Sequence, residues 1–217
     1  MHSVIIHWPY LLLAILCLWF PRHWLRLGYR LVKIRRRHRN TVERFAESGA
    51  GGDPYDKTVR LARELRSKRN YIDFFRGMGG AYALIYFSFT MTTDDARTSL
   101  LVVQAVIILI GTLVQSLRFG KTFLLFAPLF YIFGAGLAVA GLVAGGFAML
   151  LAGALNLLMP TPRSLLGLYG LLLLGFSLLF PVNFLRTLLF AVIALLPALM
   201  SLLLNRSLIT HSHKIRM

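Results

Sequence analysis

Apolar residues fall into long segments that approach the length of a membrane-crossing helix. Such a helix needs roughly 20 mainly apolar residues to cross a hydrocarbon core of about 30 Å. The uncharged stretch 122–158 would be about 55 Å long as one helix, so we expect two short helices turning near Gly145 and Gly146. The pattern predicts an all-α transmembrane bundle of six or seven helices, six if residues 122–158 or the first segment are re-entrant. The other apolar segments are residues 4–20, 77–93, 98–117, 164–180 and 187–204.

The polar stretch 21–76 carries basic residues at a helical spacing. Between residues 22 and 37 they recur every three or four positions, and apolar residues recur on another face. A glycine-rich break at 47–52 precedes Asp53 and Pro54, which are typical of a helix start. We expect a basic amphipathic hairpin lying on an anionic membrane surface, or packing on the protein itself. The candidate lipid- or partner-binding residues are Arg22, Arg26, Arg30, Lys33 and Arg37.

Charge order predicts the topology of the chain. Basic residues follow the first apolar segment rather than precede it, which favours a retained anchor over a cleaved signal peptide. Short cytoplasmic loops are rich in Lys and Arg. We therefore expect a bacterial inner-membrane protein with the N-terminus outside and the C-terminus in the cytoplasm. The expected regions are an anchor helix at 1–20, a basic hairpin at 21–76, the bundle at 77–204 and a basic tail at 205–217.

Composition supports a membrane protein and opposes two other classes. Hydrophobic residues make up 57% of the 217 residues and charged residues 15%, whereas roughly a quarter of a soluble domain is charged. Lys and Arg number 24 against 8 Asp and Glu, but a disordered basic chain lacks such apolar content. Sixteen of the 24 basic residues lie between Arg22 and Arg76, beside an apolar segment. Membrane topology and anionic lipid head groups explain this charge better than nucleic acid does. We also expect a protein partner or self-association.

Few residues of the apolar segments could carry chemistry. Gln104 and Gln115 are 11 residues apart, about three turns, so they share roughly one helix face. Their side chains either form hydrogen bonds between helices or line a site through which a ligand passes. Small residues spaced four apart between 134 and 153 indicate close helix packing or self-association. The histidines and the single Cys17 form no recognisable metal or disulfide pattern, so we expect no catalytic, cofactor or metal site.

One motif resembles a known family. Residues 70–77, NYIDFFRG, are similar to the Ile-Asp-x-x-Arg-Gly entry to the first membrane helix of acyltransferase-3-type membrane acyltransferases. The resemblance implies a lipid-modifying enzyme that uses Asp73 and Arg76. Such enzymes usually carry a histidine in the helix that follows, but the segment 78–93 contains none. The alternative is local, because Asp73 and Arg76 are three apart and can pair across one helix turn.

Three hypotheses of function follow. The leading one is a non-enzymatic accessory or assembly subunit that docks anionic lipid or partners through its basic hairpin. The second is a small transporter or channel that uses the Gln104 and Gln115 face. The third is the lipid-modifying enzyme that the resemblance implies.

Overall fold

The computed structural model describes residues 4–21, 64, 65, 67–91, 97–118, 124–158, 161–180, 184–205, 208 and 209. This part of the chain is mostly helical, which confirms the all-α class. By length and composition, four helices, counting α7 as one, are long and apolar enough to cross a membrane, and they indicate an integral membrane protein, as predicted. The five candidate basic residues from Arg22 to Arg37, and with them most of the predicted hairpin, lie outside the described residues. The four helices are α6 (Arg97–Ser116), α7 (Leu129–Ala154), α8 (Pro162–Leu179) and α9 (Phe184–Leu203).

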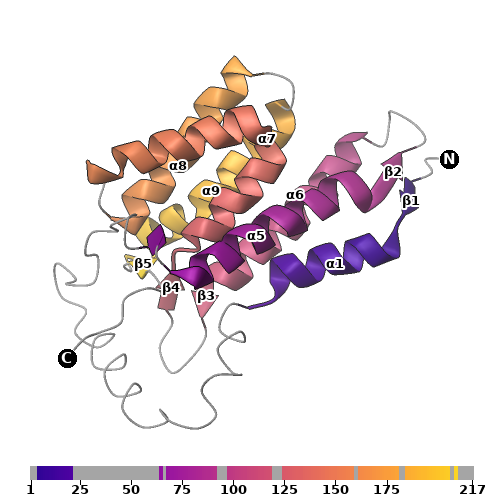
Figure 1. The fold of residues 1–217 in the computed structure, drawn as a ribbon, viewed down its shortest axis with the longest axis horizontal. Coiled ribbons are helices and arrows are strands. Elements are labelled where there is room, and N and C mark those ends of the chain that lie inside the picture. Colours follow the sequence, from indigo (N-terminus) through magenta and orange to yellow (C-terminus); the bar gives the residue numbers. More distant parts are fainter. Residues whose placement is uncertain are drawn as a thin grey trace, which may run out of the picture.

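The first apolar segment forms a strand and a short helix. Strand β1 (Val4–Ile6) precedes α1 (Trp8–Trp19), which begins with a proline in its first turn. Proline is favoured there because it has no N–H to leave unbonded and its φ suits a helix start. β1 pairs antiparallel with β2 (Phe89–Met91), and the two strands lie together at one end of the bundle (Figure 1). We term this the two-stranded end.

Helix α5 (Lys68–Tyr82) begins nine residues before the predicted start at Gly77. A π-helical turn, η2 (Ala83–Phe87), continues it toward β2. Helix α1 packs against both α5 and α6, and the three run in similar directions in Figure 1. The early start follows from the burial of Asn70 and Asp73, polar residues that hydropathy alone assigns to solvent.

The opposite end of the bundle holds a small sheet of β3 (Leu117–Arg118), β4 (Leu124–Phe126) and β5 (Leu208–Ile209). β3 pairs antiparallel with β4, and β4 pairs parallel with β5. The end of α6, the start of α7 and the chain after α9 therefore meet at this three-stranded end. Arg163 at the start of α8 donates a 2.9 Å hydrogen bond to Ser201 near the end of α9, so α8 also begins there.

Helix α7 is two arms joined at a break. Gly141 has φ 81° and ψ 172°, a conformation that essentially only glycine adopts. A Cβ on Gly145 would lie 2.7 Å from the carbonyl oxygen of Gly136, so the two arms fold back on each other beside the break. The predicted turn at Gly145 and Gly146 is therefore wrong by four residues. Gly145 is needed inside the second arm, where the absence of a side chain permits the close approach.

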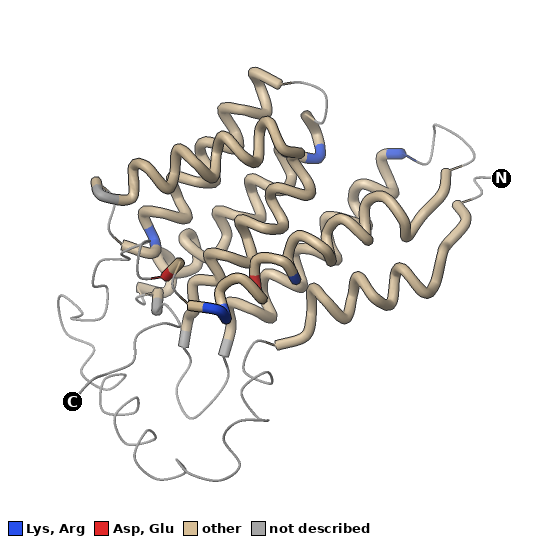
Figure 2. The backbone as a smooth tube through the Cα atoms, viewed as in Figure 1, with Lys and Arg blue, Asp and Glu red and all other residues tan. Residues whose placement is uncertain are grey.

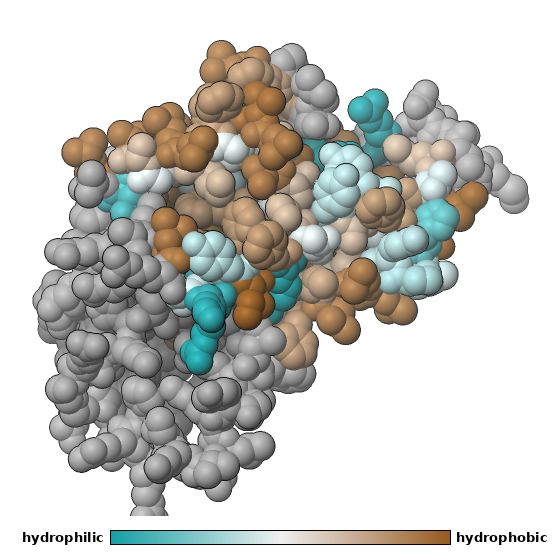
Figure 3. All heavy atoms as spheres, in the orientation of Figure 1, coloured by the Kyte–Doolittle hydropathy of each residue, from teal (hydrophilic) through white to brown (hydrophobic). Residues whose placement is uncertain are grey.

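The first arm of α7 forms the core. Every residue from 129 to 140 except Leu137 is buried, which is typical of a helix surrounded on all sides. α5 approaches this arm closely, because a Cβ on Gly77 would meet the Tyr131 carbonyl and one on Gly134 would meet the Phe74 carbonyl. Large apolar residues remain exposed on the outer helices, and Figure 3 shows broad hydrophobic surface on the visible face. Charged positions are few along the tube in Figure 2.

Candidate functional site

A buried polar cluster surrounds the C-terminal end of α1. The last carbonyls of a helix have no partner within the helix and need donors from elsewhere. Gln115 of α6 donates its Nε2 to the carbonyl oxygens of Phe20 at 2.9 Å and Leu18 at 3.2 Å. Arg76 of α5 donates to Phe20 O at 2.7 Å, and the Tyr131 hydroxyl of α7 donates to Leu18 O at 3.4 Å. Three elements thus fix the point at which the chain leaves α1.

Asp73 and Arg76 form the ion pair that their spacing predicts. Arg76 Nη2 lies 3.6 Å from Asp73 Oδ1, and the two side chains expose only 10% and 4% of their surface. The Arg76 guanidinium also lies 5.9 Å from the centre of the Tyr131 ring, within range of a cation–π contact. A cation is favoured at a helix C-terminus, where the helix dipole is negative. Asp73 keeps this buried cation paired.

The residues of the acyltransferase-like motif divide between two faces of α5. Asn70, Asp73 and Gly77 are buried, whereas Tyr71 and Phe75 are exposed. The Asn70 amide donates to Glu64 at its side-chain oxygen, 2.7 Å away, and at its carbonyl, 2.9 Å away. The buried face therefore attaches α5 to the chain before it and to α1. These contacts give Asn70 and Arg76 structural roles in helix packing, and those roles do not depend on catalysis.

The structure places the two glutamines of α6 at different sites. Both are buried, but Gln115 belongs to the cluster at the end of α1. Gln104 donates its Nε2 to the carbonyl of Leu84, in the π-helical turn η2, at 3.3 Å. Its Oε1 has no hydrogen-bond partner among the described residues. Eleven residues separate the two amides, about 16 Å along the helix, and they do not meet.

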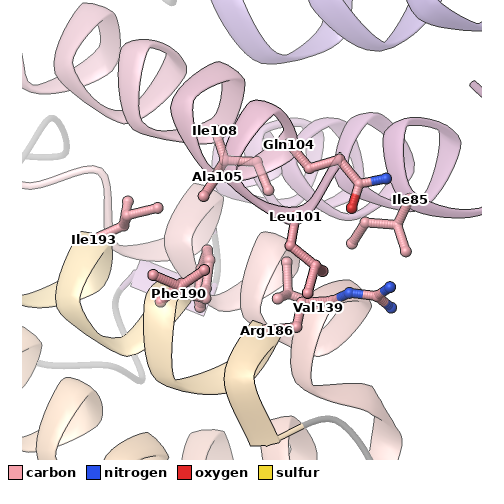
Figure 4. Close-up of a pocket in the computed structure, with 10 residues that line it drawn as sticks. Ile85, Leu101, Gln104, Ala105, Ile108, Val139, Arg186, Phe190 and Ile193 are labelled. Atoms are coloured by element: carbon pink, nitrogen blue, oxygen red, sulfur yellow. The ribbon is translucent and has the colours of Figure 1, made fainter. Parts of the chain in front are cut away.

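Gln104 lines a groove between α6 and α9. Figure 4 shows its amide and the guanidinium of Arg186 extending to the same side, with Ile85 between them. The sequence pattern places Arg186 in a break between segments, so its position in this groove was missed. A signal was present, since Arg186, Leu189, Phe190 and Ile193 have the spacing of one helix face. The groove is lined by Ile85, Leu101, Gln104, Ala105, Ile108, Val139, Arg186, Leu189, Phe190 and Ile193.

Comparison with protein-family models, with curated proteins and with solved structures finds no match for this chain. The likeness to the acyltransferase-3 type therefore stays confined to residues 70–77. Among the described residues, no group of three His, Cys, Asp or Glu side chains could hold a metal ion. Cys17 is partly buried on α1.

Proposed function

We propose that the chain is a non-enzymatic integral membrane protein that docks anionic lipid through its basic segment, residues 22–63, as an accessory or assembly subunit. The observation that carries the proposal is the hydrogen bond from Arg76 to Phe20 O, reinforced by Gln115. These bonds join the residues on either side of the basic segment at one point of an apolar bundle. The described residues that flank the segment therefore lie at the three-stranded end, where we place the membrane surface.

The exposed charges next to the basic segment support the same proposal. Lys68 and Arg69, at the start of α5, are exposed, whereas the nearby acids Glu64 and Asp73 are buried. The described surface beside the segment is therefore cationic. Each basic residue near an anionic membrane surface contributes about 1 kcal/mol of attraction.

We infer that α7 is a re-entrant hairpin and that the three-stranded end faces the cytoplasm. Arms of 12 and 13 residues are about 18–20 Å long, well short of a 30 Å hydrocarbon core. α5 with η2 has 20 residues and is long enough, and β1 adds length to the short α1. Crossings by α1, α5, α6, α8 and α9 then number five, fewer than the six or seven that the apolar pattern predicts. An odd number still puts the N-terminus outside and the C-terminus inside.

Hydrogen exchange in nanodiscs tests the docking. Full-length protein is placed in discs of phosphatidylcholine alone or with phosphatidylglycerol, and exchange is measured in peptides covering residues 22–63. We expect slower exchange of these peptides in the anionic discs, because bound backbone is shielded, and loss of the difference at high salt. Replacing Arg30, Lys33 and Arg37 with Gln should remove the difference in exchange between the two kinds of disc, and it lowers helix propensity little.

The matched control keeps the charge. Arg30→Lys with Arg37→Lys should retain the slower exchange, because lysine supplies the same point charge to a lipid surface. Equal exchange of the wild-type segment in the two kinds of disc would contradict lipid docking and leave a protein partner as the explanation of the charge.

A further inference from the structure

Four aromatic side chains form an exposed patch beside the two-stranded end. Tyr10 lies in the first turn of α1, Tyr82 is the last residue of α5, and Tyr86 and Phe87 belong to the π-helical turn η2. The ring centres of Tyr82 and Tyr86 are 4.6 Å apart. The ring centre of Phe87 lies 5.6 Å from that of Tyr10 and 5.8 Å from that of Tyr82. We term these four residues the aromatic patch.

The aromatic patch combines packing with exposure. Rings at these distances attract one another, so the contacts join the start of α1 to the end of α5 as one surface. Each of the four side chains nevertheless exposes 48% of its surface. Three of them are tyrosines, which have an apolar ring and a polar hydroxyl. Such side chains are enriched at the boundary between hydrocarbon and water, where one end is apolar and the other is wet.

The exposed face of α5 and η2 has the order of residues expected of a membrane crossing. Two basic residues are exposed at the end far from β2, and tyrosines of the aromatic patch are exposed at the other end. The two elements together have 20 residues, which rise about 30 Å, the thickness of a hydrocarbon core. The aromatic patch therefore lies where a head-group layer is expected. In chain order, the exposed residues are Lys68, Arg69, Tyr71, Ile72, Phe75, Gly79, Tyr82, Tyr86 and Phe87.

Polar groups lie beyond the aromatic patch at the same end. The exposed side chains of His7 and Thr90 are hydrogen-bonded at 2.9 Å, beside the paired strands β1 and β2. Arg97 begins α6 at this end and is exposed. An arginine there can donate hydrogen bonds to the phosphates of lipid head groups. The order from apolar helix to aromatic patch to polar groups matches the order of layers in a bilayer.

We propose that the aromatic patch lies in the head-group layer on the side opposite the basic segment and fixes the depth of α1 and α5 in the bilayer. The tyrosine hydroxyls bond to the polar groups of the lipids, and the rings lie at the level of the head groups. The partner is thus the lipid surface itself rather than one kind of lipid. Interfacial aromatic residues of this kind set how a membrane helix is tilted and rotated. The basic segment takes no part in this anchor.

Tryptophan quenching in vesicles tests the depth of the aromatic patch. Trp8 is 61% exposed and precedes Tyr10 by two residues. It is the only tryptophan left after Trp19→Phe and Trp24→Phe. The full-length protein is reconstituted in phosphatidylcholine that carries bromine either near the head group or near the chain end, and bromine quenches tryptophan at its own depth. We expect the shallow bromines to quench Trp8 roughly twice as strongly as the deep ones, because the aromatic patch lies at the head groups.

A position on the same face of α1 is the matched control. Leu16 is 63% exposed and lies two turns beyond Trp8, about 12 Å along the helix. With Trp8→Phe and Leu16→Trp in the same background, the deep bromines should quench more strongly than the shallow ones. Both proteins lack the hydrogen bond from Trp19 to Ile107 O, so the difference between them reports depth.

Variants test whether the aromatic patch sets this depth. In long-chain phosphatidylcholine the hydrocarbon is thicker than the apolar length of the protein, and an end without an anchor is drawn below the head groups. There the ratio of shallow to deep quenching of Trp8 should stay near two with the patch intact. It should fall to about one or less when Tyr10, Tyr82 and Tyr86 are all replaced by Leu. Phe147→Leu, which removes a ring of similar exposure outside the patch, should leave the ratio unchanged.

A second set of replacements guards against misfolding. Phe at the same three positions keeps the ring contacts and removes only the hydroxyls, so the ratio should fall while Leu16→Trp is still quenched by the deep bromines. Equal quenching of Trp8 by the two lipids in the protein with the intact patch would overturn the proposal. Weak quenching by both would show that a partner protein or a second copy covers the patch. A ratio that changes only when Arg30, Lys33 and Arg37 are replaced by Gln would assign the depth to the basic segment.

Discussion

Single glycines decide how closely helices approach in this molecule. A Cβ on Gly77 of α5 would collide with the carbonyl of Tyr131, whereas a Cβ on Gly79, in the same helix, would have nothing within 4 Å. The two positions therefore form a matched pair in which only the neighbouring backbone differs.

We expect Gly77→Ala to destabilise the fold by about 1–3 kcal/mol, because the α5–α7 contact must open. Gly79→Ala should be neutral or stabilising by up to about 1 kcal/mol, since alanine favours a helix. Thermal unfolding of the purified proteins in detergent measures both. Equal midpoints for the two variants would show that the close contact is unimportant.

Arg76 offers a second test at this scale. Arg76→Met removes the hydrogen bond to Phe20 O and takes the cation away from buried Asp73, so we expect a loss of about 3–5 kcal/mol. Adding Asp73→Asn should recover part of the loss, because the remaining buried charge is then gone. Unfolding of both variants in detergent is the measurement. A single variant as stable as wild type would argue that Arg76 serves something other than packing.

At the scale of elements, the helix boundaries that depend on composition were predictable. Segments predicted at 98–117, 164–180 and 187–204 are within a few residues of α6, α8 and α9. The start of α5 was not, because it lies among polar residues. Asn70 and Asp73 are buried and pair with Glu64 and Arg76 nearby in the chain, which a hydropathy window does not detect.

In the candidate site, too, some contacts could be predicted from the sequence and others could not. Spacing alone predicted the Asp73–Arg76 pair, because partners three residues apart meet on any helix. Spacing could not assign Gln104 and Gln115 to different sites, since their partners lie on η2 and α1, 20 and up to 97 residues away. Several glycines in 122–158 could form a turn, and sequence alone does not show that Gly145 packs against Gly136 while Gly141 forms the break.

The break in α7 gives a prediction about backbone conformation. Gly141→Ala should destabilise the protein by about 1–3 kcal/mol through its φ of 81°, although a Cβ there would meet nothing within 4 Å. Gly146→Ala in the second arm is the control, because its Cβ makes only ordinary contact with Leu137 and its backbone is helical. Chemical denaturation in detergent compares them. If Gly141→Ala unfolds at the same concentration as the control, the break does not depend on glycine.

At the scale of the whole molecule, the two ends of the bundle differ in which helix ends and strands lie there. The three-stranded end holds the ends of α6 and α9, the starts of α7 and α8, and the attachment of the basic segment. The two-stranded end holds β1 and β2. This division predicts which loops share a side of the membrane.

Reporter fusions test that division. A fusion after Met217 should give green fluorescence and no alkaline phosphatase activity, because we place the tail in the cytoplasm. A fusion truncated after Asp95 should give the reverse. Phosphatase activity from the tail fusion would invert the proposed orientation.

Thiol labelling tests the depth of the α7 hairpin. In a Cys17→Ser background, Leu142→Cys places a thiol beside the break, at a residue that is 80% exposed. We expect no reaction with a membrane-impermeant maleimide on intact cells, because arms of 18–20 Å end within the hydrocarbon. Thr93→Cys, in the polar sequence between β2 and α6, should react. Labelling of the Leu142 position would show that both arms cross.

The polar cluster at the end of α1 also sets an order of events during synthesis. Gln115 follows Phe20 by 95 residues, which a ribosome adds in about 5–20 s. Until then the carbonyls of Leu18 and Phe20 lack this donor, and the first helix enters the bilayer with its end incompletely bonded. The helix therefore reaches its final position only after α6 has been made. In a nascent chain that ends before Gln115, helix α1 has therefore not yet docked. Proteins that assist membrane insertion can still contact it at that stage.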